Sequence, residues 1–148
     1  MPTRSELSPA QRKLLSSQPI ARLATSTASG EPSLVPITFI LSDDRILIVI
    51  DDKPKSGKTL RRVQNIRENS SVAVLIDHYE DEWTALWWLL IRGAGEILEF
   101  EDFSEQQQLK IPSTFRKKYR QYKELNFTDR TFISITIEVV SSWRFDSA

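Results

Sequence analysis

Residues 51–66, DDKPKSGKTLRRVQNI, contain the triplet Gly57-Lys58-Thr59, which matches the end of a nucleotide-binding P-loop. At the position of the first P-loop glycine, however, this chain has Asp52. A carboxylate there would repel the phosphates, and its Cβ would obstruct the tight turn that glycine permits. No apolar strand ending in an Asp that could hold Mg²⁺ stands out further along the chain. The sequence therefore argues against a nucleotide hydrolase.

The same segment has the features of a simpler phosphate site. Five cations lie close together directly after an apolar strand: Lys53, Lys55, Lys58, Arg61 and Arg62. Ser56 is predicted to cap a helix running from about Gly57 to Glu68, and a helix N-terminus offers free N–H groups and a positive dipole end. Together with the hydroxyls of Ser56 and Thr59, this suits a phosphate monoester. The alternative is a solvated basic turn, and both interpretations stay open.

Composition limits the classes of function. The chain has 148 residues with 40% hydrophobic content, which predicts a single domain over 1–148 with its own core. Lys plus Arg equals Asp plus Glu at 20 each, which argues against a general nucleic-acid binder. The absence of cysteine excludes disulfides and thiol chemistry. With His78 as the only histidine and no nucleophile elbow, neither a zinc set nor a catalytic triad stands out.

No membrane segment is expected. The N-terminal stretch MPTRSELSPAQRKLLSSQ is polar, and the longest apolar run, around ALWWLLI at 85–91, is too short to cross a bilayer. We therefore expect a soluble cytoplasmic protein.

The elements that must position the basic segment are mostly strands. Alternating or apolar runs predict six of them, at 20–27, 33–41, 46–52, 70–79, 83–100 and 130–145. A helix is predicted from Pro9 to Leu15 with Ser8 as its N-cap, and the polar segment 101–125 reads as two helical halves broken by Pro112. Six strands with few short helices, most paired sequentially, favour a small antiparallel β-barrel.

Irregularities in two strands, a hairpin and a set of core residues are also predicted. Pro36 removes a ladder donor, which predicts a bulge or an edge in strand 33–41, and Gly93 and Gly95 predict a bend in strand 83–100. Strands 33–41 and 46–52 are expected to form a hairpin. The residues expected in the barrel core are Leu23, Ile37, Phe39, Leu47, Val49, Val74, Ile76 and Ile135.

Strand 83–100 is apolar on both faces, because Trp83, Ala85, Trp87, Leu89 and Ile91 alternate with Thr84, Leu86, Trp88 and Leu90. A barrel has one interior, so a helix of the same chain or a second subunit must cover the other face. The tryptophans either pack in the core, or at least one of them stacks near a flat ligand at a dimer seam.

Taken in order, these motifs resemble a known family. The segments IARLATSTASGEPSLVPITFIL and DDKPKSGKTLRRVQNIRENSSVAVLIDHYEDEWTALWWLLIRGAGEI resemble the FMN-binding split barrels of the pyridoxamine-phosphate-oxidase-like superfamily. More narrowly, they are similar to the small members often called deazaflavin-dependent oxidoreductases. The resemblance covers about residues 14–98. Members of that subgroup carry Arg and Thr after KPK, whereas this chain continues Ser56-Gly57-Lys58-Thr59, which leaves open which cation contacts the phosphate.

The resemblance implies a homodimer of six-stranded split β-barrels with two cofactors in the seams between subunits. The cofactor would be FMN or, alternatively, the deazaflavin coenzyme F-420. The second strand would lie along the flavin ring and offer it backbone groups, at Val35, Pro36, Ile37 and Thr38. Ile50 and Asp51 would approach the ring or the ribityl chain. The phosphate would be held by Lys53, Lys55, Ser56, Lys58 and Thr59. Trp88 would contact the cofactor from the fifth strand.

Two classes of function follow from this resemblance. The first is an oxidoreductase that moves a hydride between the bound cofactor and a small acceptor, with no side chain required as a catalytic acid or base. The second is a non-catalytic flavin or haem binding protein that acts as a carrier, because one fold hosts many functions. In both cases the expected partners are a second copy of the chain and a small molecule, with no nucleic acid and no membrane.

Overall fold

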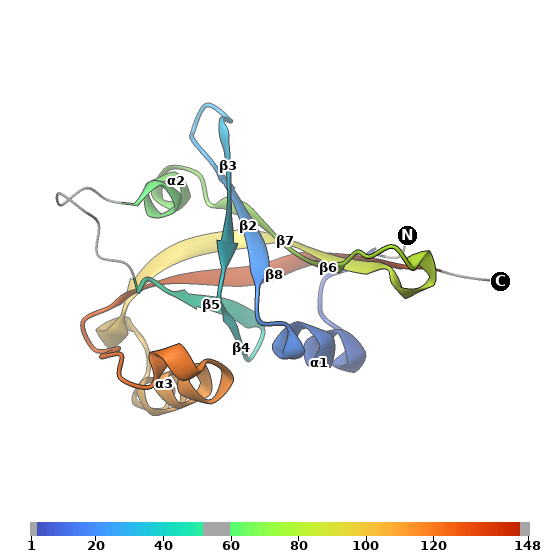
Figure 1. Ribbon diagram of the computed structural model, residues 1–148. Helices are drawn as coiled ribbons and strands as arrows, with labels where there is room; N and C mark the ends of the chain where they lie inside the picture. The colour runs from blue at the N-terminus through green and yellow to red at the C-terminus, as the bar shows by residue number, and fades with distance from the viewer. Residues whose placement is uncertain (1–2, 52–59, 146–148) are drawn as a thin grey trace.

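The computed structural model describes residues 3–51 and 60–145, and its strands form one antiparallel sheet (Figure 1). The strands are β1 Thr3–Arg4, β2 Ala21–Ser26, β3 Pro32–Ile37, β4 Ile40–Ser42, β5 Arg45–Val49, β6 Ser71–His78, β7 Trp87–Glu99 and β8 Thr131–Arg144. The helices are α1 Pro9–Ser17, α2 Arg61–Glu68 and α3 Glu105–Lys118, with single 3-10 turns η2 Trp83–Ala85, η3 Phe100–Asp102 and η4 Arg120–Tyr122.

The two outermost strands of the sheet follow each other directly in the sequence, so the sheet curls. Its strand order is β3-β2-β6-β7-β8-β5-β4, with β1 paired to β8. The outermost strands, β3 and β4, are joined by only Thr38 and Phe39, and no ladder connects them in the part of the chain that the structure describes. The predicted mainly antiparallel split barrel is therefore confirmed.

The described residues form eight strands rather than the six predicted. The predicted strand 33–41 is two strands, β3 and β4, and the short strand β1 was not predicted. The division falls at Phe39 because its backbone N–H donates to the hydroxyl of Tyr119 (3.0 Å) instead of to a neighbouring strand. Pro36 lies on β3, which pairs with β2 and with no other strand in the described part of the chain, so it is an edge strand, as the missing donor of Pro36 predicts. The predicted hairpin is formed by β4 and β5.

The bend predicted in the long strand is also present. The register between β7 and β8 shifts between Arg92 and Gly93. A Cβ at Gly93 would lie 2.0 Å from the carbonyl oxygen of Thr136, so only glycine allows the two backbones to approach this closely. The start of the predicted strand 83–100 is wrong, however. Trp83 belongs to the turn η2, where the Glu82 side chain accepts from the backbone of Thr84, and it is 70% exposed.

The helices depart from prediction in two places. Helix α1 begins at Pro9 and Ser8 caps it as predicted, through a capping box with Gln11. Helix α2 begins at Arg61 rather than near Gly57, because Leu60 is extended and packs against the core. The predicted cap Ser56 lies outside the described residues.

Helix α3 runs through Pro112 without the predicted break. A proline inside a helix removes one hydrogen bond and crowds the preceding turn. Here Pro112 is buried together with Ile111 and Phe115, so the packing of this face against the sheet offsets that cost.

Two hydrophobic clusters lie on opposite faces of β5. Ile46 and Ile48 point into the barrel, whereas Leu47 and Val49 point to a second cluster beneath α3 and η4. Figure 1 shows α3 below the β4–β5 end of the sheet. All eight residues predicted to form the core are buried. The outer face of β5 is thus covered by a helix of the same chain.

Candidate cofactor site

A cavity of about 250 Å³ lies where β3 ends, beside β5 and α2. Its walls are Ile20, Pro36, Ile37, Thr38, Ile48, Val49, Asp51 and Arg62. Four of these, Pro36, Ile37, Thr38 and Asp51, were predicted as cofactor-binding residues from two separate segments of the sequence. The fold brings the segments together because the Thr38–Phe39 link joins β3 to β4, and β4 pairs with β5, which ends just before Asp51.

Backbone groups are available on this side of the barrel. β3 pairs with β2 along one edge, with Pro36 opposite Arg22, and its other edge pairs with no strand among the described residues. Unpaired N–H and C=O groups on an edge strand bind readily to another hydrogen-bonding partner. The edge of β3 can therefore serve a planar ligand that carries donors and acceptors on its rim.

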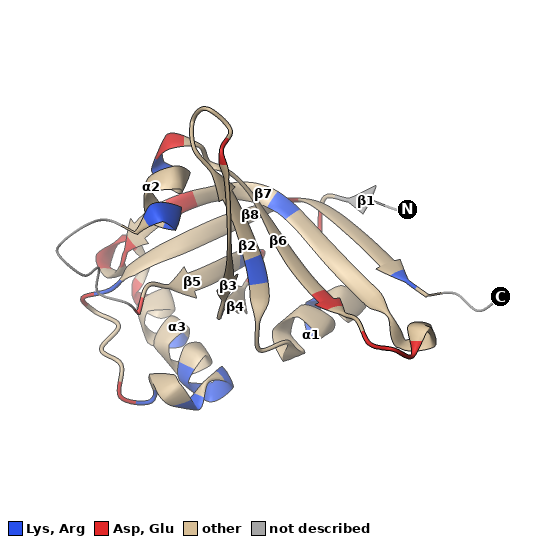
Figure 2. Ribbon diagram, turned by 45° about the horizontal axis from the view of Figure 1, so that its top comes forward, with Lys and Arg blue, Asp and Glu red and all other residues tan. Residues whose placement is uncertain are grey.

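Positive charge reaches the cavity from α2. Arg62 lies in the first turn of this helix, and its side chain forms part of the cavity wall. Figure 2 shows basic residues on α2. The predicted phosphate-binding residues Lys53, Lys55, Ser56, Lys58 and Thr59 lie outside the described residues.

The hydroxyl of Tyr122 joins two walls of the cavity. It donates to the Asp51 carboxylate (3.0 Å to Oδ2) and lies 2.5 Å from the Thr38 hydroxyl. The ring of Tyr122 is buried in the second cluster, where it meets the rings of Phe115 and Tyr119 edge to face. Burial raises the pKa of Tyr122 to about 12, so the hydroxyl keeps its proton at neutral pH.

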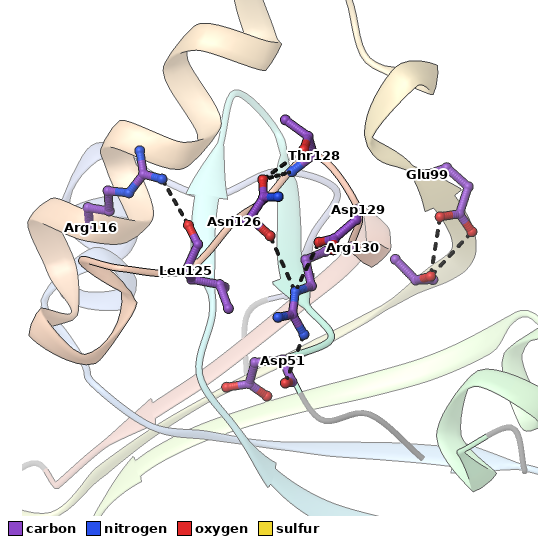
Figure 3. A network of polar contacts seen from close by, with 9 residues as sticks. Asp51, Glu99, Arg116, Leu125, Asn126, Thr128, Asp129 and Arg130 are labelled. Atoms are coloured by element: carbon purple, nitrogen blue, oxygen red, sulfur yellow. Dashed lines mark hydrogen bonds and ion pairs between the residues drawn. The ribbon is translucent and has the colours of Figure 1, made fainter. Parts of the chain in front are cut away.

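The backbone of Asp51 is held from the other side by Arg130, just before β8 (Figure 3). Arg130 donates from Nη1 to the Asp51 carbonyl (3.1 Å) and from Nε to the Asn126 carbonyl (3.3 Å). Its side chain is mostly buried, and Asp129 lies 3.4 Å from Nε. Asp51 is therefore fixed at both its carbonyl and its carboxylate, at the end of the chain segment that precedes the basic turn.

Helix α3 and η4 also fix the link between β3 and β4. The Tyr119 hydroxyl contacts both backbone groups of Phe39 (3.0 Å each) and donates to the Pro19 carbonyl (2.8 Å). Lys118 donates to the same Phe39 carbonyl (3.0 Å), and its Nζ lies 3.7 Å from the centre of the Phe39 ring. Burial lowers the pKa of Lys118 to about 8.

Three predicted site residues do not line this cavity. Val35 packs against the barrel core and Ile50 is buried in it, so only their backbones can face a ligand. Trp88 lies in the wall of a different cavity of about 680 Å³, between α1 and the ends of β7 and β8. Within one subunit, Trp88 and Thr38 do not share a site.

Trp88 belongs instead to the outer face of the sheet. It pairs with Asp77 on β6 and with Trp143 on β8, and directly paired residues point to the same face. Further along this face is an apolar hollow of about 390 Å³, lined by Arg22, Ala24, Leu34, Ala73, Leu75, Asp77 and Leu90. Leu34 is 69% exposed. No residue of α1, α2 or α3 is among the described residues that line this hollow.

Sequence reasoning missed Tyr122 and Arg130 altogether and included Arg62 only as one of several nearby cations. Tyr119 and Tyr122 are spaced three apart in the otherwise polar run KKYRQYKEL, which is a signal that this face packs against something. Nothing in the sequence near Arg130 indicates its contact with Asp51, which lies far away along the chain.

Two kinds of feature are absent from residues 3–51 and 60–145. No cluster of His, Cys, Asp or Glu in these ranges could hold a metal ion. Helices long and apolar enough to span a bilayer are likewise missing from this part of the chain.

Comparison with known proteins extends this description. Residues 7–144 match the family described as "Pyridoxamine 5'-phosphate oxidase". No curated protein matches the chain. Among solved structures, an FAD-binding protein from Mesorhizobium loti is similar with 22% identity and a TM-score of 0.66, covering 96% of this chain and 97% of that one.

Two further structures share the fold. The heme storage protein HutZ from Vibrio cholerae has 15% identity and a TM-score of 0.66, covering 94% of each chain. A conserved hypothetical protein from Mycobacterium tuberculosis has 19% identity and a TM-score of 0.70, covering 95% of this chain and 86% of that one. At these identities the likeness concerns the fold alone, and it extends over nearly the whole chain.

Proposed function

The chain belongs to the pyridoxamine 5'-phosphate oxidase family, and on that premise we propose that it is a flavin-dependent oxidoreductase that uses FMN. In this proposal it transfers a hydride between the cofactor and a small acceptor, as a homodimer with the cofactor at the subunit seam. The observation that carries the proposal is the cavity at the end of β3, where Pro36, Ile37, Thr38 and Asp51 converge with Arg62.

The groups around this cavity fit a flavin. The unpaired edge of β3 offers backbone donors and acceptors to the rim of the ring, and Thr38 and Asp51 add side-chain oxygens. Ile37, Ile48 and Val49 supply apolar surface for a planar ring. Arg62 places a cation on the side of α2, where a phosphate would complete the cofactor.

The size of the cavity supports a site shared between subunits. Sites for small molecules commonly enclose roughly 300–1,000 Å³, and the cavity within one subunit is about 250 Å³. The apolar outer face carrying Leu34, Leu90 and Trp88 is the surface best suited to a second copy. In such a dimer Trp88 reaches the partner's cofactor, which is why it lies away from Thr38 within one chain.

The flavin, when bound, supplies the hydride chemistry. The residues of this chain bind and orient it. Pro36, Ile37 and Thr38 would hold the ring, and Asp51, held by Arg130 and Tyr122, would contact it through a polar group. Lys53, Lys55, Ser56, Lys58 and Thr59 are the proposed phosphate ligands. No general acid or base is required from the protein.

A second candidate is a non-catalytic flavin or haem binder. It is favoured by similar structures that are described as the heme storage protein HutZ and as a heme binding protein from Mycobacterium smegmatis. Haem iron is usually held by His, Cys, Met or Tyr. The chain has no cysteine, and its one histidine, His78, ends β6. Neither His78 nor any Met or Tyr is among the described residues that line the cavity, and the Tyr122 hydroxyl is hydrogen-bonded to Thr38 and Asp51. Flavin is therefore the better match to the residues present.

One experiment separates these candidates. The purified protein is titrated with FMN, with the deazaflavin coenzyme F-420 and with haemin, and absorbance and fluorescence are recorded. Tight FMN or deazaflavin binding, with bands that bleach on anaerobic addition of NADH or NADPH, supports the oxidoreductase. Binding without bleaching supports a carrier. Preference for haemin would reject the flavin proposal.

The proposed phosphate contact is tested by comparing FMN with riboflavin, which lacks the phosphate. Lys55→Ala, Lys58→Ala and the double variant are titrated with FMN and with riboflavin. Loss of one charged contact is expected to weaken FMN by about ten- to a hundredfold and to leave riboflavin unchanged. Wild-type affinity for FMN in all three variants would make the basic turn a solvated loop and move the phosphate site elsewhere.

A further inference from the structure

We infer that Tyr122 is a positioning residue that makes the Thr38 hydroxyl a hydrogen-bond acceptor toward the cavity, beside the acceptor that the Asp51 carboxylate already supplies. The site then selects a ligand edge that carries N–H or O–H donors. This inference rests on the proposed flavin function and adds the chemistry by which the cavity recognises its ligand. It concerns Tyr122 because the hydroxyl of this residue contacts both polar walls of the cavity.

The direction of each hydrogen bond follows from the number of protons available. An ionised carboxylate can only accept, so Tyr122 donates its single hydroxyl proton to Asp51. With that proton used, the 2.5 Å contact between Tyr122 and Thr38 requires the Thr38 hydroxyl to donate. The proton of Thr38 thus points away from the cavity, and its lone pairs remain available to a ligand. Asp51 keeps its second oxygen, Oδ1, for the same purpose.

The arrangement is stable because Tyr122, the middle member of this chain of hydrogen bonds, is held in place by packing. The Tyr122 ring is buried among Phe115, Tyr119 and Phe127, so its hydroxyl cannot turn away. Burial raises the pKa of this hydroxyl, which keeps it protonated and able to donate across the physiological range.

Two acceptors side by side discriminate between ligand edges. Thr38 is half-buried and Asp51 is exposed in the free chain, so a bound ligand has to replace water at both. An acceptor that is covered by a ligand and meets another acceptor stays unsatisfied, which disfavours the wrong ligand. A flavin offers donors at two places, the imide N–H of the ring and the hydroxyls of the ribityl chain. Carboxylate groups, such as the propionates of haem, offer only acceptors when ionised. Thr38 and Asp51 therefore favour flavin over haem in this cavity.

The test compares FMN with two analogues: 3-methyl-FMN, which lacks the imide N–H, and a flavin phosphate whose side chain has no hydroxyls. Wild type is expected to bind one of the two analogues about three- to tenfold more weakly than FMN. The analogue that binds more weakly shows which donor of FMN, the imide N–H or a side-chain hydroxyl, the site recognises. Tyr122→Phe keeps the packed ring and removes the proton that directs the others. In this variant the affinity ratio of FMN to that analogue is expected to fall toward one.

Matched variants distinguish an effect on the direction of the hydrogen bonds from a general loss of protein stability. Tyr119→Phe removes a hydroxyl from the same cluster that contacts Phe39 but neither Thr38 nor Asp51, and it is expected to keep the wild-type ratio. Should Tyr122→Phe fold poorly, the same affinity ratio is measured in two variants of Thr38. It is expected to fall in Thr38→Val, which lacks the hydroxyl, and to return toward the wild-type value in Thr38→Ser, which keeps it. If wild type binds FMN and every variant keeps its ratio, this inference is wrong and the flavin function stands. If wild type binds no flavin at all, the proposed function itself is wrong.

Discussion

The hydroxyl of Tyr119 takes the place of a neighbouring strand for Phe39. It accepts from the Phe39 N–H and lies within 3.0 Å of the Phe39 carbonyl, at the point where the chain passes from one end of the sheet to the other. The ring of Phe39 is fully buried in the barrel, so its backbone groups have little access to water. A side chain from the residue between α3 and η4 thereby satisfies the backbone groups that the sheet leaves unpaired.

Replacing Tyr119 by Phe is expected to destabilise the protein by about 1–3 kcal/mol, because the buried Phe39 N–H loses its acceptor. Urea unfolding followed by tryptophan fluorescence measures the change. Tyr79→Phe, which removes the same atom from an exposed side chain, serves as the control and is expected to have no effect. Equal stability of the two variants would show that the Phe39 N–H finds another partner.

Lys118 is expected to make stability depend on pH. Its pKa is lowered to about 8 by burial, below the ordinary value near 10.5. As the pH rises from about 8 toward 10, the folded protein releases this proton while the unfolded chain keeps it, and the free energy of unfolding therefore increases. Above about pH 10 the raised pKa values of Tyr119 and Tyr122 act in the opposite direction.

The variant Lys118→Met removes this dependence, and Lys117→Met, at an exposed neighbouring position, is the matched control. Denaturant unfolding is measured at several pH values from 7.5 to about 10. The difference in unfolding free energy between wild type and Lys118→Met is expected to grow with pH over this range. A difference that stays constant would mean that Lys118 titrates normally in the folded state.

Gly93→Ala is expected to be among the most damaging single methyl additions in the protein. The new Cβ would lie 2.0 Å from the Thr136 carbonyl oxygen, so β7 and β8 would have to separate. We expect a loss of more than about 3 kcal/mol. Gly30→Ala is the comparison, because Gly30 has φ of +93° but open space around it, and it is expected to cost about 1–2 kcal/mol. Thermal melts of the two variants check the order.

Arg130→Lys is expected to weaken flavin binding more than it weakens the fold. Lysine keeps the charge but cannot reach the Asp51 and Asn126 carbonyls at once, as the guanidinium does. Release of Asp51 is expected to lower FMN affinity about three- to tenfold, measured by quenching of flavin fluorescence. Arg120→Lys, an exposed arginine in η4, is the control. Unchanged affinity in Arg130→Lys would place Asp51 outside the binding site.

Much of the fold follows from local patterns, and the failures have physical causes. Period-two alternation and turn residues located β2, β5, β6, β7 and β8 within a few residues. The break at Phe39 could not be predicted, because it depends on Tyr119, which lies far along the chain. Pro112 was read as a helix breaker because its local cost is visible in the sequence, whereas its burial beside Phe115 is not.

The residues of the candidate site also fall into two groups, those that the sequence indicated and those that it did not. Pro36, Thr38 and Asp51 were predicted through resemblance to a family, and they line one cavity. Tyr122 and Arg130 act through hydrogen bonds to residues distant in sequence, and no spacing rule reveals such contacts. Residues that orient a site are therefore harder to find from sequence than residues that line it.

The position of β8 has a consequence for synthesis on the ribosome. β8 is made after every other described strand, yet it lies between β7 and β5 and also pairs with β1. The hairpin of β4 and β5 therefore has no further partner in the sheet until residues 131–144 leave the exit tunnel. Until then the apolar faces of β5 and β7 stay open, and the nascent chain is a natural client for chaperones that shield such surfaces. The described sheet can be completed only when β8 enters between β7 and β5.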